Sequence, residues 1–196
     1  MNLRMIAISG CPKSQYYSSI CTEAWQSLGY SVRKFEATTP ETLGNELAFA
    51  EKKFSGKPFT PTEKAIWYSH FRLWQTVRTP THIIEHDTYP TKLLQDFSDK
   101  PAAIFSIFPR NDSAWQGRRE HISPGSGYYI TLSTASILID YARSMEITEN
   151  VDGFIYQQLK RILGMEDKEF NEYHLNRSSC FQIVNYDVGT SAQHNT

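Results

Sequence analysis

The first part of the chain carries the pattern that most restricts the fold. An apolar run, Leu3–Ser9, ends at the turn-forming segment Gly10–Pro12. The segment Ser14–Leu28 then has helical character and stops at Gly29, and a second strand is predicted over Ser31–Ala37. A strand, a helix and a strand in direct succession favour two parallel strands joined by a covering helix.

Later segments extend this pattern. Four more strand-like runs are predicted, at Thr81–Ile84, Ala102–Phe108, Gly127–Ser133 and Cys180–Tyr186. Four more helices are predicted, at Thr42–Phe54, Pro61–Val77, Thr134–Met145 and Asp152–Leu163. We therefore expect an α/β fold in which a mostly parallel, Rossmann-like sheet is flanked by helices. The 196 residues contain no repeat or clear linker, so we expect a single domain over 1–196.

The helix Pro61–Val77 has the clearest sequence signals. Thr60 is placed as its N-cap, Pro61 occupies the first helical position, and Glu63 completes a capping box. Five residues at helical spacing are predicted to share one face of this helix: Ile66, His70, Leu73, Trp74 and Val77. Without further context, His70 on such a face is best interpreted as a buried, hydrogen-bonded core histidine.

The strand that follows ends in three titratable residues. Thr81–Ile84 leads directly into Glu85, His86 and Asp87. Ligands of open α/β sheets bind outside the carboxyl ends of the strands, where such groups can stay hydrated or bind a ligand. Two carboxylates that flank one residue can hold a hard divalent cation through oxygen. A solvated turn is the alternative interpretation of the same tripeptide.

Composition restricts the class and the setting of the protein. The net charge is −1, which argues against a dedicated nucleic-acid binder. The three cysteines match no zinc motif and predict reduced thiols. The N-terminal apolar run is too short for a signal sequence, and no segment reaches the length of a membrane span. These features predict a protein of the cytoplasm.

A set of motifs occurs in one order along most of the chain. Glu63, Ser69-His70 and Trp74 share the helix, and the strand ending in Glu85-His86-Asp87 follows. Four further segments accompany them: FEATTPE (35–41), GSGYYITLSTASILI (125–139), ENVDGFI (149–155) and VGTSAQHNT (188–196). The arrangement resembles glycosyltransferase family 25, which includes lipooligosaccharide and collagen galactosyltransferases. The chain departs from the family pattern at His86, which replaces an acid, at Leu132, which replaces a serine, and in its short length.

The resemblance implies a GT-A-like fold with a nucleotide-sugar site at the carboxyl ends of the strands. Asp87 would bind Mn²⁺ or Mg²⁺, with help from Glu85, and His194 could add a late ligand. The ion would bridge the phosphates of a nucleotide-sugar donor, with a UDP-sugar expected. The acceptor would be a hydroxyl of a glycan, a lipid-linked saccharide or another molecule.

The resemblance also places residues of the first turn and the helix near the donor. Ser9, Gly10 and Lys13 would approach the nucleotide, and a plain turn with a surface lysine is the alternative. Ser69 and His70 belong to the shared motif, so they are candidate donor-binding residues.

An inverting reaction, as in family members of known chemistry, needs a general base, and Asp152 fits by motif position. Its alternative role is to cap the helix Gly153–Leu163. For His194, a disordered terminus is the alternative.

Three other functions remain open on the sequence alone. The segment Pro109–His121 interleaves Arg110, Arg118 and Arg119 with Trp115, and such a loop could bind modified DNA as the acceptor. A catalytically silent module that binds nucleotide-sugars could use the same fold. A metal-dependent phosphohydrolase would need further carboxylates at the ion, and the remaining candidates are Asp112, Asp140 and Asp167.

Overall fold

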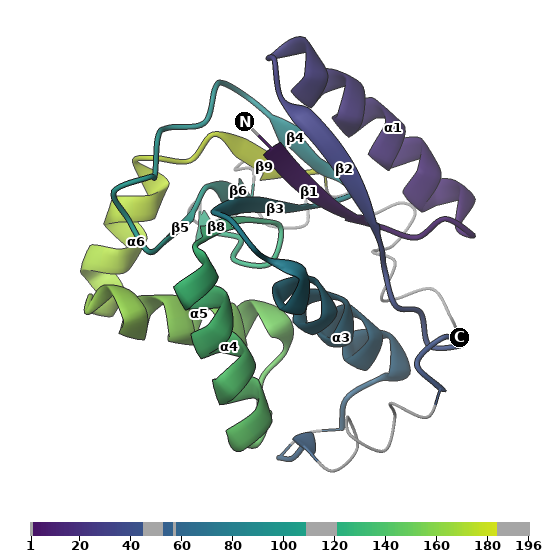
Figure 1. Cartoon of the computed structure of the whole chain (residues 1–196), viewed down its shortest axis with the longest axis vertical. Coiled ribbons are helices and arrows are strands. Elements are labelled where there is room, and N and C mark those ends of the chain that lie inside the picture. The colour runs from purple at the N-terminus through teal and green to yellow at the C-terminus, as the bar shows by residue number, and fades with distance from the viewer. Residues whose placement is uncertain (1, 45–52, 57, 109–120, 184–196) are drawn as a thin grey trace.

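The computed structural model describes residues 2–44, 53–56, 58–108 and 121–183. Its centre is a five-stranded sheet with the order β2-β1-β3-β8-β5 (Figure 1). The strands are β1 (Asn2–Ala7), β2 (Ser31–Glu36), β3 (Thr81–Glu85), β8 (Gly127–Ile130) and β5 (Ala102–Ile104). β1 pairs in parallel with β2 and β3, whereas β8 runs antiparallel to both β3 and β5. Four of the five strands therefore share one direction, and the predicted α/β class is confirmed.

A smaller sheet has the order β4-β9-β6-β7. Its strands are β4 (Thr88–Pro90), β9 (Cys180–Gln182), β6 (Ser106–Phe108) and β7 (His121–Ile122). β4 pairs antiparallel with β9, so this sheet joins the end of β3 to the last described part of the chain. β4 and β7 are too short to leave a sequence pattern, and both are absent from the sequence prediction.

The single strand predicted over Ala102–Phe108 is wrong, because the chain changes sheets at Phe105. The Phe105 amide donates to the Gly127 carbonyl at 3.0 Å, which continues the pairing with β8. The Phe105 carbonyl accepts instead from the amides of Ser179 and Cys180, at 2.9 and 3.2 Å. The segment is apolar except for Ser106, so its composition does not reveal this change of partner.

Helices cover both faces of the central sheet (Figure 1). α1 (Pro12–Ser27) lies on one face, and α3 (Pro61–Thr76), α4 (Leu132–Ser144) and α5 (Val151–Leu163) lie on the other. α6 (Asp167–Leu175), which the sequence did not predict, follows α5. Gly29 follows the C-cap of α1 with φ +87°, as the predicted stop requires. The predicted helix Thr42–Phe54 lies mostly outside the described residues.

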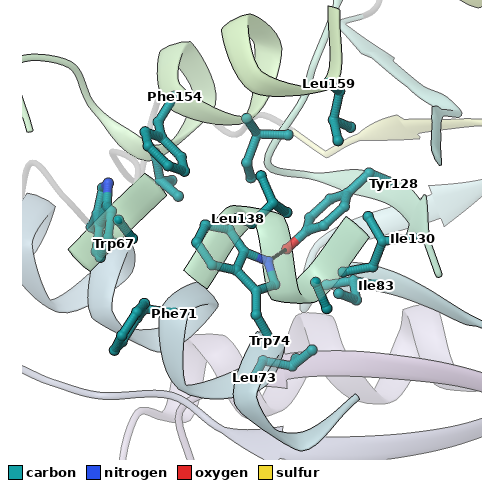
Figure 2. Packing of buried hydrophobic residues seen from close by; sticks show 14 of the residues in the cluster. Trp67, Phe71, Leu73, Trp74, Ile83, Tyr128, Ile130, Leu138, Phe154 and Leu159 are labelled. Carbon is teal, nitrogen blue, oxygen red and sulfur yellow. Dashed lines mark hydrogen bonds between the residues drawn. The ribbon is translucent and has the colours of Figure 1, made fainter. Parts of the chain in front are cut away.

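The helix α3 begins as predicted but is buried more widely. The Thr60 hydroxyl accepts from the Glu63 amide, and the Glu63 carboxylate accepts from the Thr60 amide, which forms the capping box. Burial extends beyond the predicted stripe to Trp67 and Phe71, because α3 packs against α4 and α5 as well as the sheet. Figure 2 shows the Trp67 ring near Phe154 of α5.

Two helix boundaries differ from the prediction. The strand predicted to reach Ser133 ends at Ile130, because Thr131 caps α4 by accepting from the Thr134 amide. Asn150, and not Asp152, caps α5 by accepting from the Gly153 amide at 3.0 Å. The capping role considered for Asp152 is therefore wrong. Across the described ranges, no helix is both long enough and apolar enough to cross a membrane.

Candidate active site

The carboxyl end of β3 holds the acidic tripeptide as the sequence predicted. Glu85 is the last residue of β3, and its side chain is 20% exposed. One carboxylate oxygen of Glu85, Oε2, accepts from Ser126 Oγ at 3.1 Å and from Gln182 Nε2 at 3.2 Å. Burial opposes the charge, but His70, His86 and Ser126 outweigh it, so the pKa of Glu85 lies below its ordinary value. Glu85 is thus an ionised carboxylate in a partly buried position.

Asp87 follows in the turn to β4 and is only partly hydrogen-bonded. Its Oδ2 lies 3.5 Å from the Gln182 amide nitrogen. Its Oδ1 is buried and has no hydrogen-bond partner in the described parts of the chain. Burial, followed by the negative charge of Glu85, raises the pKa of Asp87 well above its ordinary value. A buried carboxylate oxygen without a partner is costly unless a cation or a donor binds it.

Asp152 comes from α5, far away in sequence, and reaches the same group of carboxylates. Its Oδ1 accepts from the Gly125 amide at 2.7 Å. Gly125 precedes Ser126, whose hydroxyl donates to Glu85, so one short turn contacts both carboxylates. Burial, followed by the charge of Glu85, raises the pKa of Asp152 to about 6. A carboxylate with this pKa is suited to accept a proton near neutral pH.

His70 is fully buried between Glu85 and β8. Its Nδ1 lies 2.8 Å from the Tyr128 hydroxyl, and its Nε2 lies 3.7 Å from Glu85 Oε1. The predicted core histidine is therefore confirmed as buried and hydrogen-bonded, but one ring nitrogen faces the acidic group. Trp74 Nε1 donates to the same Tyr128 hydroxyl at 2.8 Å (Figure 2).

Ser69, the neighbour of His70, has an internal role in this geometry. The side chain is 1% exposed, and its hydroxyl accepts from the Thr38 amide and donates to the Ala65 carbonyl, both at 2.8 Å. These bonds fix the segment that follows β2 to α3. Ser69 thus positions backbone at the carboxyl edge of the sheet.

The first βα turn lies at the same edge and is exposed. The Ser9 amide donates to the Glu36 carboxylate at 2.9 Å, and the Ser9 hydroxyl donates to its other oxygen. A Cβ built on Gly10 meets no atom within 4 Å. Burial raises the pKa of Asp87 and lowers the pKa of His86. The positive charge of Lys13, in the first turn of α1, has a smaller effect and lowers the pKa of both groups. The structure therefore brings Lys13 toward the acidic tripeptide.

Several sequence-predicted residues fall elsewhere. His194 and most of Pro109–His121, with Asp112, lie outside the described residues. Asp140 is exposed on α4, and Asp167 of α6 pairs with Lys160 at 2.6 Å. These two aspartates do not join the acidic group. The phosphohydrolase alternative therefore gains no carboxylate from them.

The sequence prediction missed four residues that build the site: Gly125, Ser126, Tyr128 and Gln182. A Cβ at Gly125 would clash with the Asp152 carboxylate in its present position, so the hydrogen bond from the Gly125 amide uses the space that glycine leaves. Tyr128 lies within GSGYYITLSTASILI (125–139), one of the segments that carry the family resemblance, so the sequence contained a signal for it. Gln182 carried no signal, because its role depends on the pairing of β9 with β4.

The two carboxylates at the end of β3 supply the type of oxygen ligand that a hard divalent cation uses. Within the described residues, no group of three or more histidine, cysteine, aspartate or glutamate side chains could hold a metal. Mg²⁺, however, commonly uses only one or two protein carboxylates together with substrate phosphates. The unpartnered Oδ1 of Asp87, with Glu85 beside it, is compatible with that arrangement.

A scan against protein-family models and a search of curated proteins both find no match. Among solved structures, the chain is similar to a glycosyltransferase involved in glycosylation of the major capsid of PBCV-1, with 13% identity, 95% coverage of both chains and a TM-score of 0.48. It is also similar to the galactosyltransferase LgtC in complex with donor and acceptor sugar analogs, with 11% identity, coverage of 95% and 88%, and a TM-score of 0.49. The Streptococcus pneumoniae cytidylyltransferase LicC matches with 10% identity, coverage of 82% and 86%, and a TM-score of 0.40. At these values the similarity concerns the course of the chain and assigns no residue, and the family 25 prediction is not confirmed.

Proposed function

We propose that the protein transfers a sugar from a UDP-sugar to an acceptor hydroxyl with inversion at the anomeric carbon. The observation that carries this proposal is that Glu85, at the carboxyl end of β3, is connected to Asp87 through Gln182 and to Asp152 through the turn at Gly125 and Ser126. These residues come from two distant segments, and the turn at Gly125 and Ser126 contacts both. The family resemblance of the same residues supports the assignment, and membership of family 25 and a cytoplasmic location remain predictions.

The diphosphate end of the donor is assigned to Asp87, Glu85 and Lys13. Asp87 and Glu85 would hold Mn²⁺ or Mg²⁺, which when bound neutralises charge on the departing diphosphate. Lys13 lies in the first turn of α1, which has no acidic residue in that turn. The positive end of this helix and the Lys13 ammonium both favour a phosphate at this edge.

The acceptor side is assigned to Asp152. In the transfer step, the acceptor oxygen forms a bond to the anomeric carbon while the bond from that carbon to the diphosphate oxygen breaks. The acceptor proton passes to the Asp152 carboxylate. Its raised pKa of about 6 keeps Asp152 mostly ionised at pH 7 while leaving it basic enough to take the proton.

The decisive experiment is a thermal-stability screen of UDP-, GDP- and dTDP-sugars with and without Mn²⁺. A donor at about 100 times its Kd should add roughly 2.7 kcal/mol of stability. Asp87→Asn should lose the metal-dependent part of this response and about 10³-fold in transfer or donor hydrolysis. Asp140→Asn, an exposed carboxylate on α4, is the matched control and should keep both.

Two outcomes contradict the proposal. Donor binding without any turnover by the native protein indicates the catalytically silent module. No response to any donor, with or without Mn²⁺, removes the nucleotide-sugar assignment altogether.

Binding of modified DNA with strong salt dependence would favour the DNA acceptor, for which the described residues offer no observation.

A further inference from the structure

A line of buried polar groups runs from the core between α3 and β8 to the edge of the sheet. Trp74, Tyr128 and His70 are all 1% exposed or less. The indole nitrogen of Trp74 lies 2.8 Å from the Tyr128 oxygen, which lies 2.8 Å from His70 Nδ1. The remaining ring nitrogen of His70 faces Glu85 Oε1 at 3.7 Å. The direction in which each proton points along this line can be deduced.

The starting point is the indole of Trp74, because its N–H can only donate. The Tyr128 oxygen therefore accepts from Trp74. If His70 Nδ1 also donated to this oxygen, the tyrosine proton would lack an acceptor, since no other partner of this hydroxyl lies among the described residues. An unsatisfied buried donor is costly. The Tyr128 hydroxyl consequently donates to Nδ1, and Nδ1 carries no proton.

The other ring nitrogen of a neutral imidazole then carries the proton. His70 Nε2 is buried and has no hydrogen-bond partner within the usual distance in the described structure. Glu85 Oε1 lies 3.7 Å away and can become its acceptor after a small movement. Catalytic hydrogen bonds are often long without substrate and shorten in the complex.

We infer that Trp74, Tyr128 and His70 form a directional hydrogen-bond chain that presents an Nε2–H donor to Glu85 and fixes the orientation of this carboxylate for the donor diphosphate. The three are positioning residues, since none of them is assigned a contact with substrate. The functional part of the inference rests on the proposed sugar transfer, whereas the proton arrangement does not. Glu85 then keeps Oε2 on Ser126 and Gln182 and uses Oε1 for His70.

The proton arrangement is tested by ¹⁵N NMR of the histidine ring nitrogens in the full-length protein without any ligand. The signals of His70 are assigned by their loss in His70→Gln. We expect an unprotonated Nδ1 and a protonated Nε2 at pH 7, and a mixture of tautomers in Tyr128→Phe. Tyr129→Phe is the matched control, because Tyr129 is the neighbouring tyrosine on the opposite face of β8 and packs in the other core. Protonation of Nδ1 in the native protein, alone or with Nε2, would overturn the inference.

The positioning role is tested by kinetics with the donor found in the screen. Partners of this kind typically contribute about 10- to 100-fold to activity, so Tyr128→Phe should lower kcat by that factor with the donor KM unchanged. His70→Gln, whose amide can donate from a similar place, should keep more activity than His70→Leu. Equal kcat in native protein and folded Tyr128→Phe would overturn the role. A correct tautomer without turnover on any donor would instead leave the chain standing and reject the proposed function.

Discussion

The two faces of the central sheet are packed with similar residues but differ in how they handle polar groups. On the face toward α1, the buried residues include His82, which packs among Phe97, Phe105 and Tyr129, and Trp25 Nε1 donates to the backbone carbonyl of Thr88 at 2.9 Å. On the face toward α3, Trp74 Nε1 donates to the Tyr128 side chain, which continues to His70 and Glu85. One tryptophan completes local backbone bonding, and the other begins a line of side chains that reaches the site. The line of polar side chains that reaches the candidate site therefore distinguishes the face toward α3 from the face toward α1.

The largest expected effect belongs to Asp152 of α5, on the same side of the sheet as α3. Asp152→Asn removes the proposed base and should lower kcat by about 10²- to 10⁴-fold. Asp140→Asn on α4 serves as the surface control and should leave kcat unchanged. If Asp152→Asn retains native kcat, Asp152 is not the base and its closeness to Glu85 is structural.

The same substitution should raise stability, because burial makes the ionised Asp152 unfavourable. Its folded pKa of about 6 exceeds the ordinary 3.8, so the native fold loses stability as pH rises from 3.8 through about 6. The amide introduced by Asp152→Asn carries no proton to lose, and its oxygen can still accept from Gly125. Denaturant titrations should show the variant about 1 to 2 kcal/mol more stable at pH 8 and equal to native at pH 3.5. A variant that is less stable at pH 8 would show that the carboxylate stabilises the fold.

The next effect compares the two tryptophans directly. Trp25→Phe and Trp74→Phe each remove a buried indole N–H bond and leave a small cavity, so each should cost about 2 to 3 kcal/mol. Only Trp74→Phe should also lower kcat of the folded protein, by about 10-fold. Denaturation curves measure the loss of stability, and steady-state kinetics on the same samples measure the loss of kcat. A matching fall in kcat for Trp25→Phe would erase the distinction between the faces.

The smallest effect concerns the glycines at the two ends of α1. Gly10 has no positive φ and open space at its Cβ position, so Gly10→Ala should raise stability by about 0.5 kcal/mol. Gly29 has φ +87°, and Gly29→Ala should cost about 1 kcal/mol. Only Gly10→Ala should raise the donor KM, since this turn is proposed to approach the nucleotide. An unchanged donor KM in steady-state kinetics would remove Gly10 from the donor site.

Local signals in the sequence predicted much of the fold. The capping box at Thr60 and Glu63, and the stop at Gly29, depend on neighbouring residues only, and both occur as expected. The second sheet was not predictable in this way. Its strands are two or three residues long, and β4 and β9 pair across a long sequence separation. Strands this short show no alternating pattern in the sequence. Which strand each one pairs with is decided by tertiary packing.

The candidate site shows the same division. The end of the strand at Glu85 and Asp87 could be located from an apolar run that stops in acids. Gln182 could not be connected to them, because its contact with Glu85 exists only once β9 lies beside β4. The position of Asp152 in the helix was also misjudged, since the preceding Asn150 competes for the cap. The residue that caps the helix is the one at which the backbone changes from extended to helical, and in α5 this residue is Asn150.

The sequence by itself determined the α/β class, the acidic end of β3 and the start of α3, because each follows from the order of apolar residues and from bonds within a few positions. Tertiary structure alone decided that Asp152 shares an electrostatic environment with Glu85, and that Tyr128 lies between Trp74 and His70. Burial and hydrogen-bond direction depend on the distance between side chains in space. Those distances are fixed only when α3, α5 and β8 pack against one another.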